Sequence, residues 1–326
     1  MTASSVQLRI GRGNKHRQVL VCFMNSKVLS IVVTAHNLEG HIKKTLESIL
    51  LAADNKVSSC ELILIDDASV DGTSNILREF ADKNENAFYF RTEFKNIGKV
   101  RNFAIDKCQS EYITMVDGDD LVYEKSLAQL IDFLENNDVD ILISPLYEIK
   151  GEIPLLDNWQ WKSPQKILQE VAIEEFLIHK KFQGHFIGKI VKKSLFRNSH
   201  FPEFYCYEDI ALIPEILHKA ESIYFCEWPF YIYIKQPHSL SSALSAEKLE
   251  LKAKALLMMD AELGSEWRHL TASHVVQLLY KHKNKLSKVA QDAMYAILQK
   301  TSTSKFFLSS SVRLSVKKKY ILLKFK

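Results

Sequence analysis

Three short stretches of this sequence place carboxylate, hydroxyl and amide side chains directly after apolar runs, at Thr34–Asn37, Asp66–Asp71 and Asp117–Asp120. Carboxylates that share a small space repel one another unless a cation or hydrogen-bond donors lie between them. The third stretch contains Asp-x-Asp, whose hard oxygen ligands suit Mg²⁺ or Mn²⁺, and such an ion can bridge protein and diphosphate oxygens. The pattern therefore indicates a site for a divalent metal and a phosphorylated ligand.

The apolar runs that must position these groups have the composition of buried strands, and segments with helical spacing separate them. The predicted strands are Leu29–Thr34, Glu61–Ile65, Phe88–Arg91, Tyr112–Val116 and Asp140–Ser144, and the predicted helices are Ile42–Ala53, Thr73–Ala81, Val100–Lys107 and Ser126–Glu135. This alternation predicts a three-layer α/β/α sandwich around a mainly parallel sheet. Because ligands bind beyond the carboxyl ends of such strands, the three polar stretches should meet at one edge.

The chain beyond residue 150 is less regular, and we expect a helix near 165–179 and two or three helices over 246–299. We divide the chain into a tail at 1–23, an α/β domain at 24–242 that carries the polar stretches, a helical C-terminal region at 243–304 and a basic amphipathic tail at 305–326. The first tail has no strand or helix periodicity and no apolar core of a secretion signal, so it is expected to be disordered or an upstream mis-start.

The net charge of +4 is unevenly distributed. Residues 1–23 carry +4 and residues 305–326 carry +7, which leaves −7 for the body of the chain. A nucleic-acid binder would carry its basic surface on the folded body, so no nucleic-acid partner is expected. No apolar run approaches the roughly 20 residues of a membrane-spanning helix. The five scattered cysteines suit a reducing cytoplasm better than a disulfide framework or a zinc site.

An ordered series of motifs over residues 28–242 resembles the family-2 glycosyltransferases, whose catalytic domain has the GT-A fold. The segments that carry the resemblance are Ser30–Asn37, Ile65–Thr73, Asn96–Gly98 with Arg101 and Asn102, Asp117–Asp120, Gly188–Phe196, Tyr207–Ile210, Tyr231–Tyr233 and Ser239–Ser241. The resemblance implies an inverting, metal-dependent enzyme that moves one sugar, of the hexosyl type, from a nucleotide-sugar donor to a glycan or lipid-linked acceptor.

The resemblance also implies roles for single residues. Thr34 and Asp67 would hold the nucleotide base, and Asp67 would accept from the uracil ring N–H if the donor is a UDP-sugar. Asp117 would face the ribose or the sugar, and Asp119 would ligate Mn²⁺ or Mg²⁺ on the diphosphate. Asp209 would be the general base that takes the acceptor proton, which suits a single-step inversion. The remaining donor-binding candidates are Asn37, Lys99, Arg101 and Glu208.

Several of these residues also have plainer interpretations. Glu208 and Asp209 are acids of the kind that a helix N-terminus favours through its dipole. His238 is a candidate metal or phosphate ligand, but a lone histidine is more often a surface or packing residue. Lys189, Lys192 and Lys193 are expected to form a solvated face.

The C-terminal segment 305–326 combines apolar residues at roughly helical spacing, from Leu308 to Leu323, with seven positive charges. A basic amphipathic segment can rest on an anionic membrane surface. The alternatives are an exposed tail or a helix that packs on the protein. The expected location is cytoplasmic, with peripheral attachment to the inner face of the inner membrane as one option.

The expected pathway is capsule or lipopolysaccharide synthesis, and a homodimer is among the expected states.

A nucleotidyltransferase would carry a glycine-rich basic loop after the first strand, and a dinucleotide oxidoreductase would carry Gly-x-Gly-x-x-Gly; this chain has neither. The rival from another class is a non-catalytic glycan-binding or scaffold subunit with the same fold. Such a subunit would be expected to lose Asp119 or Asp209, and both are present.

Overall fold

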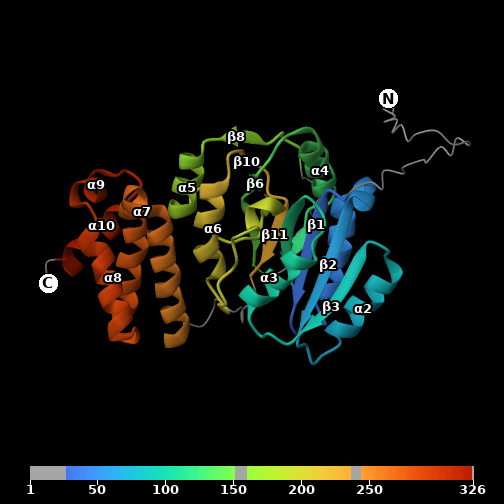
Figure 1. Ribbon diagram of the computed structural model, residues 1–326, viewed down its shortest axis with the longest axis horizontal. Helices are drawn as coiled ribbons and strands as arrows, with labels where there is room; N and C mark the ends of the chain where they lie inside the picture. Colours follow the sequence, from blue (N-terminus) through green and yellow to red (C-terminus); the bar gives the residue numbers. More distant parts are fainter. Residues whose placement is uncertain (1–26, 151–159, 236–243, 325–326) are drawn as a thin grey trace, which may run out of the picture.

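The computed structural model describes residues 27–150, 160–235 and 244–324. Its centre is an eight-stranded sheet in the order β3-β2-β1-β4-β9-β6-β10-β8, and a three-stranded sheet, β5-β11-β7, lies beside it (Figure 1). The expected N-terminal tail at 1–23 falls outside the described residues. Helices cover both faces of the large sheet, which confirms the predicted three-layer α/β architecture (Figure 1).

One half of the large sheet is fully parallel. It contains β3 (Ala87–Thr92), β2 (Cys60–Asp67), β1 (Leu29–Ala35) and β4 (Tyr112–Asp117). Every residue of β1 and β2 is buried, as expected for central strands covered on both faces. In the register of this half, Thr34 lies opposite both Ile65 and Asp117. The polar residues that follow these strands are thereby brought to one edge.

The other half of the large sheet is mixed, a feature the sequence pattern does not predict. Strand β9 (Lys189–Lys192) runs antiparallel between β4 and β6 (Ile141–Ile143). Strand β6 is the central part of the strand predicted at 140–144. Strand β10 (Ile223–Phe225) pairs parallel with β6 and antiparallel with β8 (Gln165–Ile167). The small sheet consists of β5 (Leu121–Val122), β11 (Tyr231–Ile234) and β7 (Leu146–Ile149).

The helices divide between two apolar clusters, one on each face of the sheet. On one face lie α1 (Ile42–Ala53), α2 (Thr73–Lys83) and α4 (Ser126–Asn136); on the other lie α3 (Ile97–Lys107), α5 (Gln169–Ile178) and α6 (Glu208–Lys219). The helix predicted near 165–179 is thus shorter, because residues 165–167 join the sheet as β8. Short 3₁₀ turns follow α1, β9 and α7 at Asp54–Ser59, Lys193–Phe196 and Lys283–Lys285.

The C-terminal helices share the apolar cluster of α5 and α6 and lie beyond them at one end of the molecule (Figure 1). They are α7 (Ala246–His282), α8 (Lys288–Lys300), α9 (Thr303–Leu308) and α10 (Leu314–Lys324). The backbone of Gly264 is non-helical, with φ 65°, so α7 consists of two helices across a break. Two or three helices were expected in 246–299, and the broken α7 with α8 fits that expectation.

The apolar residues of the C-terminal segment are mostly turned into the protein. Val312, Val316 and Tyr320 are buried in the same cluster as α7, and the Tyr320 ring stacks on Phe306 with centroids 4.3 Å apart. Leu308, in contrast, is 85% exposed. Of the interpretations given above, the geometry of this segment is that of a packing helix with an exposed basic side. No helix of the described residues is long and apolar enough to cross a membrane.

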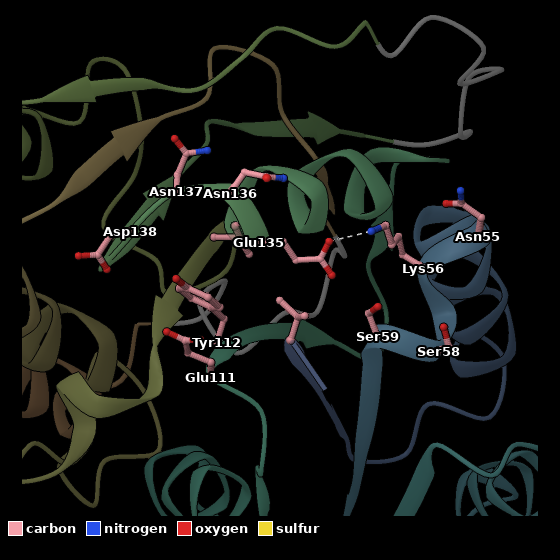
Figure 2. Close-up of a pocket in the computed structure, with 12 residues that line it drawn as sticks. Asn55, Lys56, Ser58, Ser59, Glu111, Tyr112, Glu135, Asn136, Asn137 and Asp138 are labelled. Atoms are coloured by element: carbon pink, nitrogen blue, oxygen red, sulfur yellow. Dashed lines mark hydrogen bonds and ion pairs between the residues drawn. The ribbon is translucent and has the colours of Figure 1, made fainter. Parts of the chain in front are cut away.

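A groove of about 900 Å³ lies at the amino-terminal edge of the sheet (Figure 2). Its lining includes Val28, Ser59 and Tyr112, which stand where β1, β2 and β4 begin. Lys56 spans it with an ion pair of 2.8 Å to Glu135. Because the strands are parallel, this groove is at the opposite edge from the polar stretches identified in the sequence.

Candidate active site

The carboxyl ends of β1 and β4 are joined by a close backbone contact. The amide of Gly118 donates to the carbonyl of Thr34 at 2.9 Å, and a Cβ on Gly118 would lie 2.9 Å from that same oxygen. Only glycine fits in this turn. The Thr34 hydroxyl donates to Asp117 at 3.4 Å, so two predicted donor-binding residues lie side by side.

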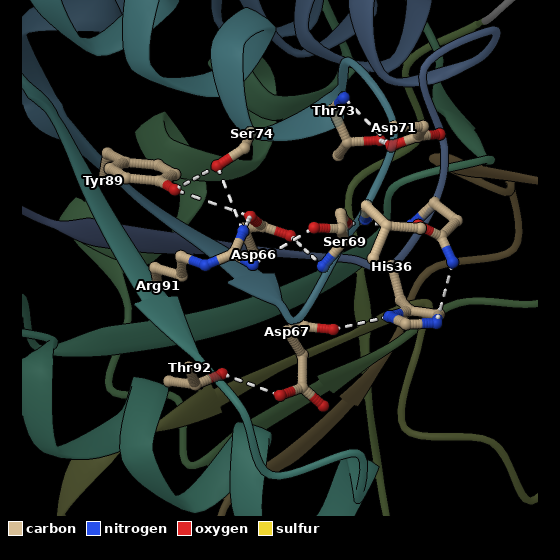
Figure 3. Close-up of polar contacts among 12 residues, drawn as sticks. His36, Asp66, Asp67, Ser69, Asp71, Thr73, Ser74, Tyr89, Arg91 and Thr92 are labelled. Carbon is tan, nitrogen blue, oxygen red and sulfur yellow. Dashed lines mark hydrogen bonds and ion pairs between the residues drawn. The ribbon is translucent and has the colours of Figure 1, made fainter.

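The carboxylate of Asp66 at the end of β2 is fully buried and is used for structure (Figure 3). It accepts from Arg91 Nη1 at 2.6 Å and from the amide of Ser69 at 3.1 Å. Arg91 also donates to the Ser69 carbonyl at 3.1 Å. These contacts fix the turn after β2, in which Ala68 has a φ of 60°.

Asp67 points away from this network and keeps part of its acceptor capacity (Figure 3). Its Oδ1 accepts from the Thr92 hydroxyl at 3.0 Å and from the amide of Phe94 at 2.7 Å. Among the described residues no donor is assigned to Oδ2. One oxygen therefore holds the side chain in place, and the other can accept a hydrogen bond from a ligand such as a nucleotide base.

Asn37, also predicted to bind the donor, ties two loops together. Its φ is 54°, its amide donates to the Ser69 hydroxyl at 2.9 Å, and its Oδ1 accepts from the amide of Val70 at 2.8 Å. The neighbouring His36 ring hydrogen-bonds to the Asp67 carbonyl at 2.5 Å (Figure 3). The side chain of Asn37 is thus occupied in shaping the edge on which Asp67 sits.

Asp120 is turned into the protein and held by the small sheet. It accepts from the Tyr231 hydroxyl and from the amide of Ile234, both at 2.7 Å. The same hydroxyl accepts from the amide of Asp117 at 3.0 Å, so Tyr231 links two residues of the acidic stretch. Burial, together with the charge of Asp117, raises the pKa of Asp120 to about 8.

Most of the six carboxylates in the three stretches are therefore satisfied by protein donors. Asp71 is also held, by the Thr73 hydroxyl at 2.6 Å and the amide of Glu39 at 3.1 Å. Asp119 differs, because no side chain among the described residues donates to it or forms an ion pair with it. Burial and the nearby charge of Asp117 raise its pKa to about 6. A carboxylate in that situation favours a cation beside it.

The donor set around Asp119 fits a hard divalent cation that takes its remaining ligands from elsewhere. No group of three histidine, cysteine, aspartate or glutamate side chains in the described ranges could enclose a metal ion. Mg²⁺ is commonly held by one or two carboxylates, water and substrate phosphates, so a full protein cage is not required. His238, the other predicted metal ligand, lies outside the described residues.

Arg101 connects the strand ends to α6. It forms a buried ion pair with Glu208, and its Nη2 lies 3.5 Å from Oδ1 of Asp117. Burial raises the pKa of the Glu208 carboxyl, against the opposing effect of the Arg101 charge. The structure thus brings together Thr34, Asp117, Arg101 and Glu208 in one continuous set of contacts.

Lys99 stands apart from that set. Its ammonium pairs with Glu203 at 2.9 Å, and its side chain is about two-fifths exposed. The loop that carries Glu203 docks on the start of α3, where the amide of Gly98 donates to the Phe204 carbonyl at 3.1 Å. A Cβ on Gly98 would come within 2.0 Å of the Pro202 carbonyl oxygen. Only a residue without a Cβ allows this loop to approach.

Asp209 lies in the first turn of α6, which Tyr207 introduces with a φ of 66°. Its Oδ2 lies 3.4 Å from Nδ1 of His185, and its Oδ1 accepts from the amide of Ile210 at 2.8 Å. Burial raises the pKa of Asp209, but the hydrogen bond and charge of His185, the charge of Arg101 and the hydrogen bond from the Ile210 amide together outweigh it, so the pKa is below its ordinary value. Nothing in the sequence singles out His185.

Lys189 corrects the expectation of a solvated face. Only 3% of the residue is exposed, and its ammonium donates to the carbonyls of Gln183, at 3.1 Å, and His185. Burial lowers the pKa of Lys189 to about 7. The expectation was wrong because β9 is inserted into the middle of the sheet, which encloses its first residue. Lys192 and Lys193 are partly exposed, as expected.

Comparisons with known proteins show the family of this chain. The model of glycosyl transferase family 2 matches residues 30–201, more than half of the 326-residue chain. Glycosyltransferase GlyG of Streptococcus pneumoniae is 26% identical over 227 residues, which cover 66% of this chain and 73% of that protein. The chain therefore belongs to glycosyl transferase family 2, and it is a glycosyltransferase.

Solved structures show the same fold. A fragment of TarS from Staphylococcus aureus in complex with UDP superposes with a TM-score of 0.63 at 17% identity, covering 90% of this chain and 89% of that one. The mannosyltransferase PcManGT from Pyrobaculum calidifontis, in complex with GDP-Man and Mn²⁺, superposes with a TM-score of 0.52 at 15% identity, covering 92% and 79%. Both support the GT-A architecture predicted from the sequence.

Proposed function

We propose that the protein transfers a sugar from a nucleotide-sugar donor to an acceptor hydroxyl with inversion at the anomeric carbon. The observation that carries this proposal is the position of Asp209. It is a buried carboxylate that connects, through neighbouring Glu208 and then Arg101, to Asp117 at the end of β4. A single displacement requires a base beside the acceptor hydroxyl and groups that bind the donor. Asp209 would supply the base, and the acidic residues at the end of β4 would bind the donor.

In this displacement the acceptor oxygen attacks the anomeric carbon as the bond from that carbon to the diphosphate breaks. The proton of the acceptor hydroxyl passes to Asp209, and the nucleoside diphosphate leaves with the bonding electron pair. His185 lowers the pKa of Asp209 against the effect of burial, so the carboxylate is ionised and ready to accept that proton. Arg101 stabilises negative charge between Asp117 and α6.

The proposed donor is a UDP-sugar. Oδ2 of Asp67, to which no donor among the described residues is assigned, would accept from the ring N–H of uracil. Thr34 is on the adjacent strand β1 and contacts Asp117 on β4. Lys99 remains a candidate for the donor phosphates, although in this structure it pairs with Glu203. The complex of TarS with UDP supports this choice for the same fold.

Asp119 would hold Mn²⁺ or Mg²⁺ together with oxygens of the donor diphosphate. When bound, the ion would offset the charge that develops on the leaving diphosphate. Within the described residues no side chain donates to the Asp119 carboxylate, which supports this assignment, and so does the Mn²⁺ in the PcManGT complex. His238 remains a candidate for a second protein ligand.

The proposed acceptor is a glycan or a lipid-linked glycan in the synthesis of capsule or lipopolysaccharide, at the cytoplasmic face of the inner membrane. The exposed Lys318 of α10, together with Leu314 and Ile321 exposed on the same helix, supports contact with anionic lipid. Loss of sedimentation with phosphatidylglycerol vesicles in a Lys318→Glu variant would support this membrane contact, and unchanged sedimentation would contradict it.

A homodimer is also proposed, and a light-scattering mass of one chain would contradict it.

The donor site is tested by thermal denaturation with UDP, GDP, CDP or dTDP, each with and without Mn²⁺. A ligand at a hundredfold excess over its dissociation constant adds about 2.7 kcal/mol to the free energy of unfolding. We expect stabilisation by UDP that is larger with Mn²⁺, and we expect Asp119→Ala to lose the metal-dependent part. If no nucleotide stabilises the protein, a non-catalytic glycan-binding subunit becomes the favoured function in place of a glycosyltransferase.

A further inference from the structure

The segment 179–188 joins α5 to β9 and carries His185, whose imidazole contacts Asp209. All of its residues belong to the described range 160–235, and none of them is in a helix or a strand. Phe182 and Phe186 are buried and anchor it in the apolar core. The side chain of His185, in contrast, is 52% exposed. The position of this imidazole therefore depends on contacts made within the segment.

Lys189, the first residue of β9, supplies such contacts from inside the protein. Its ammonium donates to the carbonyl oxygen of Gln183 at 3.1 Å and to the carbonyl oxygen of His185. It also lies 5.5 Å from the centre of the Phe182 ring, a favourable place for a cation. All three contacts are made with segment 179–188. One side chain thus fixes the backbone at His185 and just before it.

Other hydrogen bonds hold the same segment at its neighbours. The amide of Gly184 donates to Nδ1 of His179 at 3.2 Å, and Nε2 of Gln183 donates to Oε1 of Glu148 at 2.7 Å. These contacts attach the segment to the end of α5 and to β7. Lys189 attaches it to β9, through the backbone of the residue that contacts the proposed base.

A buried ammonium in this place is costly. Lys189 is 3% exposed, and within the described residues no carboxylate forms an ion pair with it. Burying a charge without a counter-charge is unfavourable unless hydrogen bonds offset the loss of water. A methionine of similar length would fill the space without that cost. What the ammonium adds over methionine is its pair of hydrogen bonds to the segment that carries His185.

We propose that Lys189 is a positioning residue, which holds the backbone at His185 so that the imidazole faces Asp209. This inference rests on the proposed function, because it concerns the base of the same reaction. Lys189 does not touch the reacting atoms and acts through His185. Without its hydrogen bonds the half-exposed imidazole would move away from Asp209, and the carboxylate would lose a partner that favours its charged form.

The pKa of His185 can separate this role from a simple effect of charge. Burial lowers that pKa, and the hydrogen bond and charge of Asp209 outweigh burial, while the charge of Lys189 lowers it. Loss of the Lys189 charge alone would therefore raise the pKa of His185, whereas loss of the contact with Asp209 would lower it. The titratable groups near His185 are Asp209 on α6, Asp117 on β4, Lys189 on β9, His179 at the end of α5 and Tyr233 on β11.

The experiment follows ¹⁵N-labelled histidines of the full chain by nuclear magnetic resonance during a pH titration. The signals of His185 are assigned by their loss in His185→Gln. We expect the pKa of His185 to be lower in Lys189→Met than in the native protein, because the imidazole no longer stays beside Asp209. An unchanged or a higher pKa of His185 in this variant would overturn the proposal.

Kinetics provide a second measurement on the same variant. A small misplacement of a catalytic group can cost about 10²-fold in rate, so kcat of Lys189→Met should fall by up to that factor. The acid limb of its kcat profile should move to higher pH, as in His185→Gln. The two changes act through one contact, so the double variant should be no slower than His185→Gln alone. Fully additive losses would contradict an action through His185.

Lys193→Met is the matched control. Lys193 follows β9 directly, and its ammonium also donates to a backbone carbonyl, that of Cys108, away from the His185 segment. This variant should change neither the pKa of His185 nor kcat. If Lys189→Met does not fold, Lys189→Gln removes the charge with a side chain one bond shorter than lysine and should change the pKa of His185 in the same direction. Retained thermal stabilisation by UDP shows that each variant is intact.

The two measurements also separate this inference from the proposed function. A lower pKa of His185 in Lys189→Met, with no change of the kcat profile in His185→Gln, would support the positioning role and contradict Asp209 as the base. A shifted kcat profile in His185→Gln, with the pKa of His185 unchanged in Lys189→Met, would keep Asp209 as the base and overturn the role of Lys189.

Discussion

The Nδ1 atom of His185 lies 3.4 Å from Oδ2 of Asp209, the carboxylate proposed as the catalytic base. The two residues come from different elements, since His185 precedes β9 and Asp209 belongs to α6. Burial lowers the pKa of His185, but the hydrogen bond and the charge of Asp209 outweigh it and raise the pKa above its ordinary value. Each group thus favours the charged form of the other, and the pair titrates as a unit.

Removing this imidazole should change how activity depends on pH. In His185→Gln the effect of burial on Asp209 remains while the lowering effect of the imidazolium is lost, so the pKa of Asp209 rises. The base must be ionised to act, and the acid limb of the kcat profile should therefore move to higher pH. A uniform fall in kcat at every pH, without a shift of that limb, would show that His185 has only a structural role.

Replacing the base itself should separate chemistry from donor binding. We expect Asp209→Asn to lower kcat by about 10²–10⁴-fold, the usual contribution of general-base catalysis. UDP should stabilise the variant against heat as well as it stabilises the native protein. Asp82→Asn is the control, because it makes the same change at an exposed position of α2 and should keep full activity. An active Asp209→Asn enzyme would contradict the assignment of Asp209 as the general base.

The ion pair of Arg101 with Glu208 should be important for folding. Both side chains are 6% exposed, so Arg101→Met leaves a buried carboxylate without its partner. Loss of one member of such a pair costs about 3–5 kcal/mol of unfolding free energy, measured by urea denaturation. The double variant Arg101→Met with Glu208→Gln should be less destabilised than the sum of the single variants.

An exposed ion pair gives the comparison for that measurement. Lys43 and Glu47 are 4.0 Å apart on the surface of α1, with side chains 76% and 58% exposed. Lys43→Met should cost less than about 0.5 kcal/mol. Equal effects of Lys43→Met and Arg101→Met would mean that the buried pair has no special part in stability.

Two glycines offer a matched test of the loop that docks on α3. A methyl group on Gly98 would lie 2.0 Å from a backbone oxygen, whereas nothing lies within 4 Å of the corresponding position on Gly40. Gly98→Ala should destabilise the protein by about 1–3 kcal/mol through overpacking. It should also lower kcat, because the displaced loop 202–204 leads directly into Tyr207 and Asp209. Gly40→Ala should change neither quantity.

Much of the parallel half of the fold is predictable from local pattern. Leu29–Ala35 and Cys60–Asp67 are mainly apolar and lack polar–apolar alternation, because both faces of their sheet are covered. The helices between the strands show their buried faces through spacing. The mixed half is not predictable in this way. Strand β9 has only four residues and no distinctive alternation, and its place between β4 and β6 depends on pairing between distant segments.

The sequence by itself determined that acidic and hydroxyl side chains meet at one edge, because parallel strands place their carboxyl ends together. Only the tertiary structure decided what each of them does. Arg91 neutralises Asp66 and Tyr231 holds Asp120, and among the described residues no donor is assigned to Oδ2 of Asp67 or to the carboxylate of Asp119 from any side chain. The contact of His185 with Asp209 is likewise formed only when the chain folds. These partners are remote in sequence and have no common spacing, so the folded chain alone brings their charges within reach of one another.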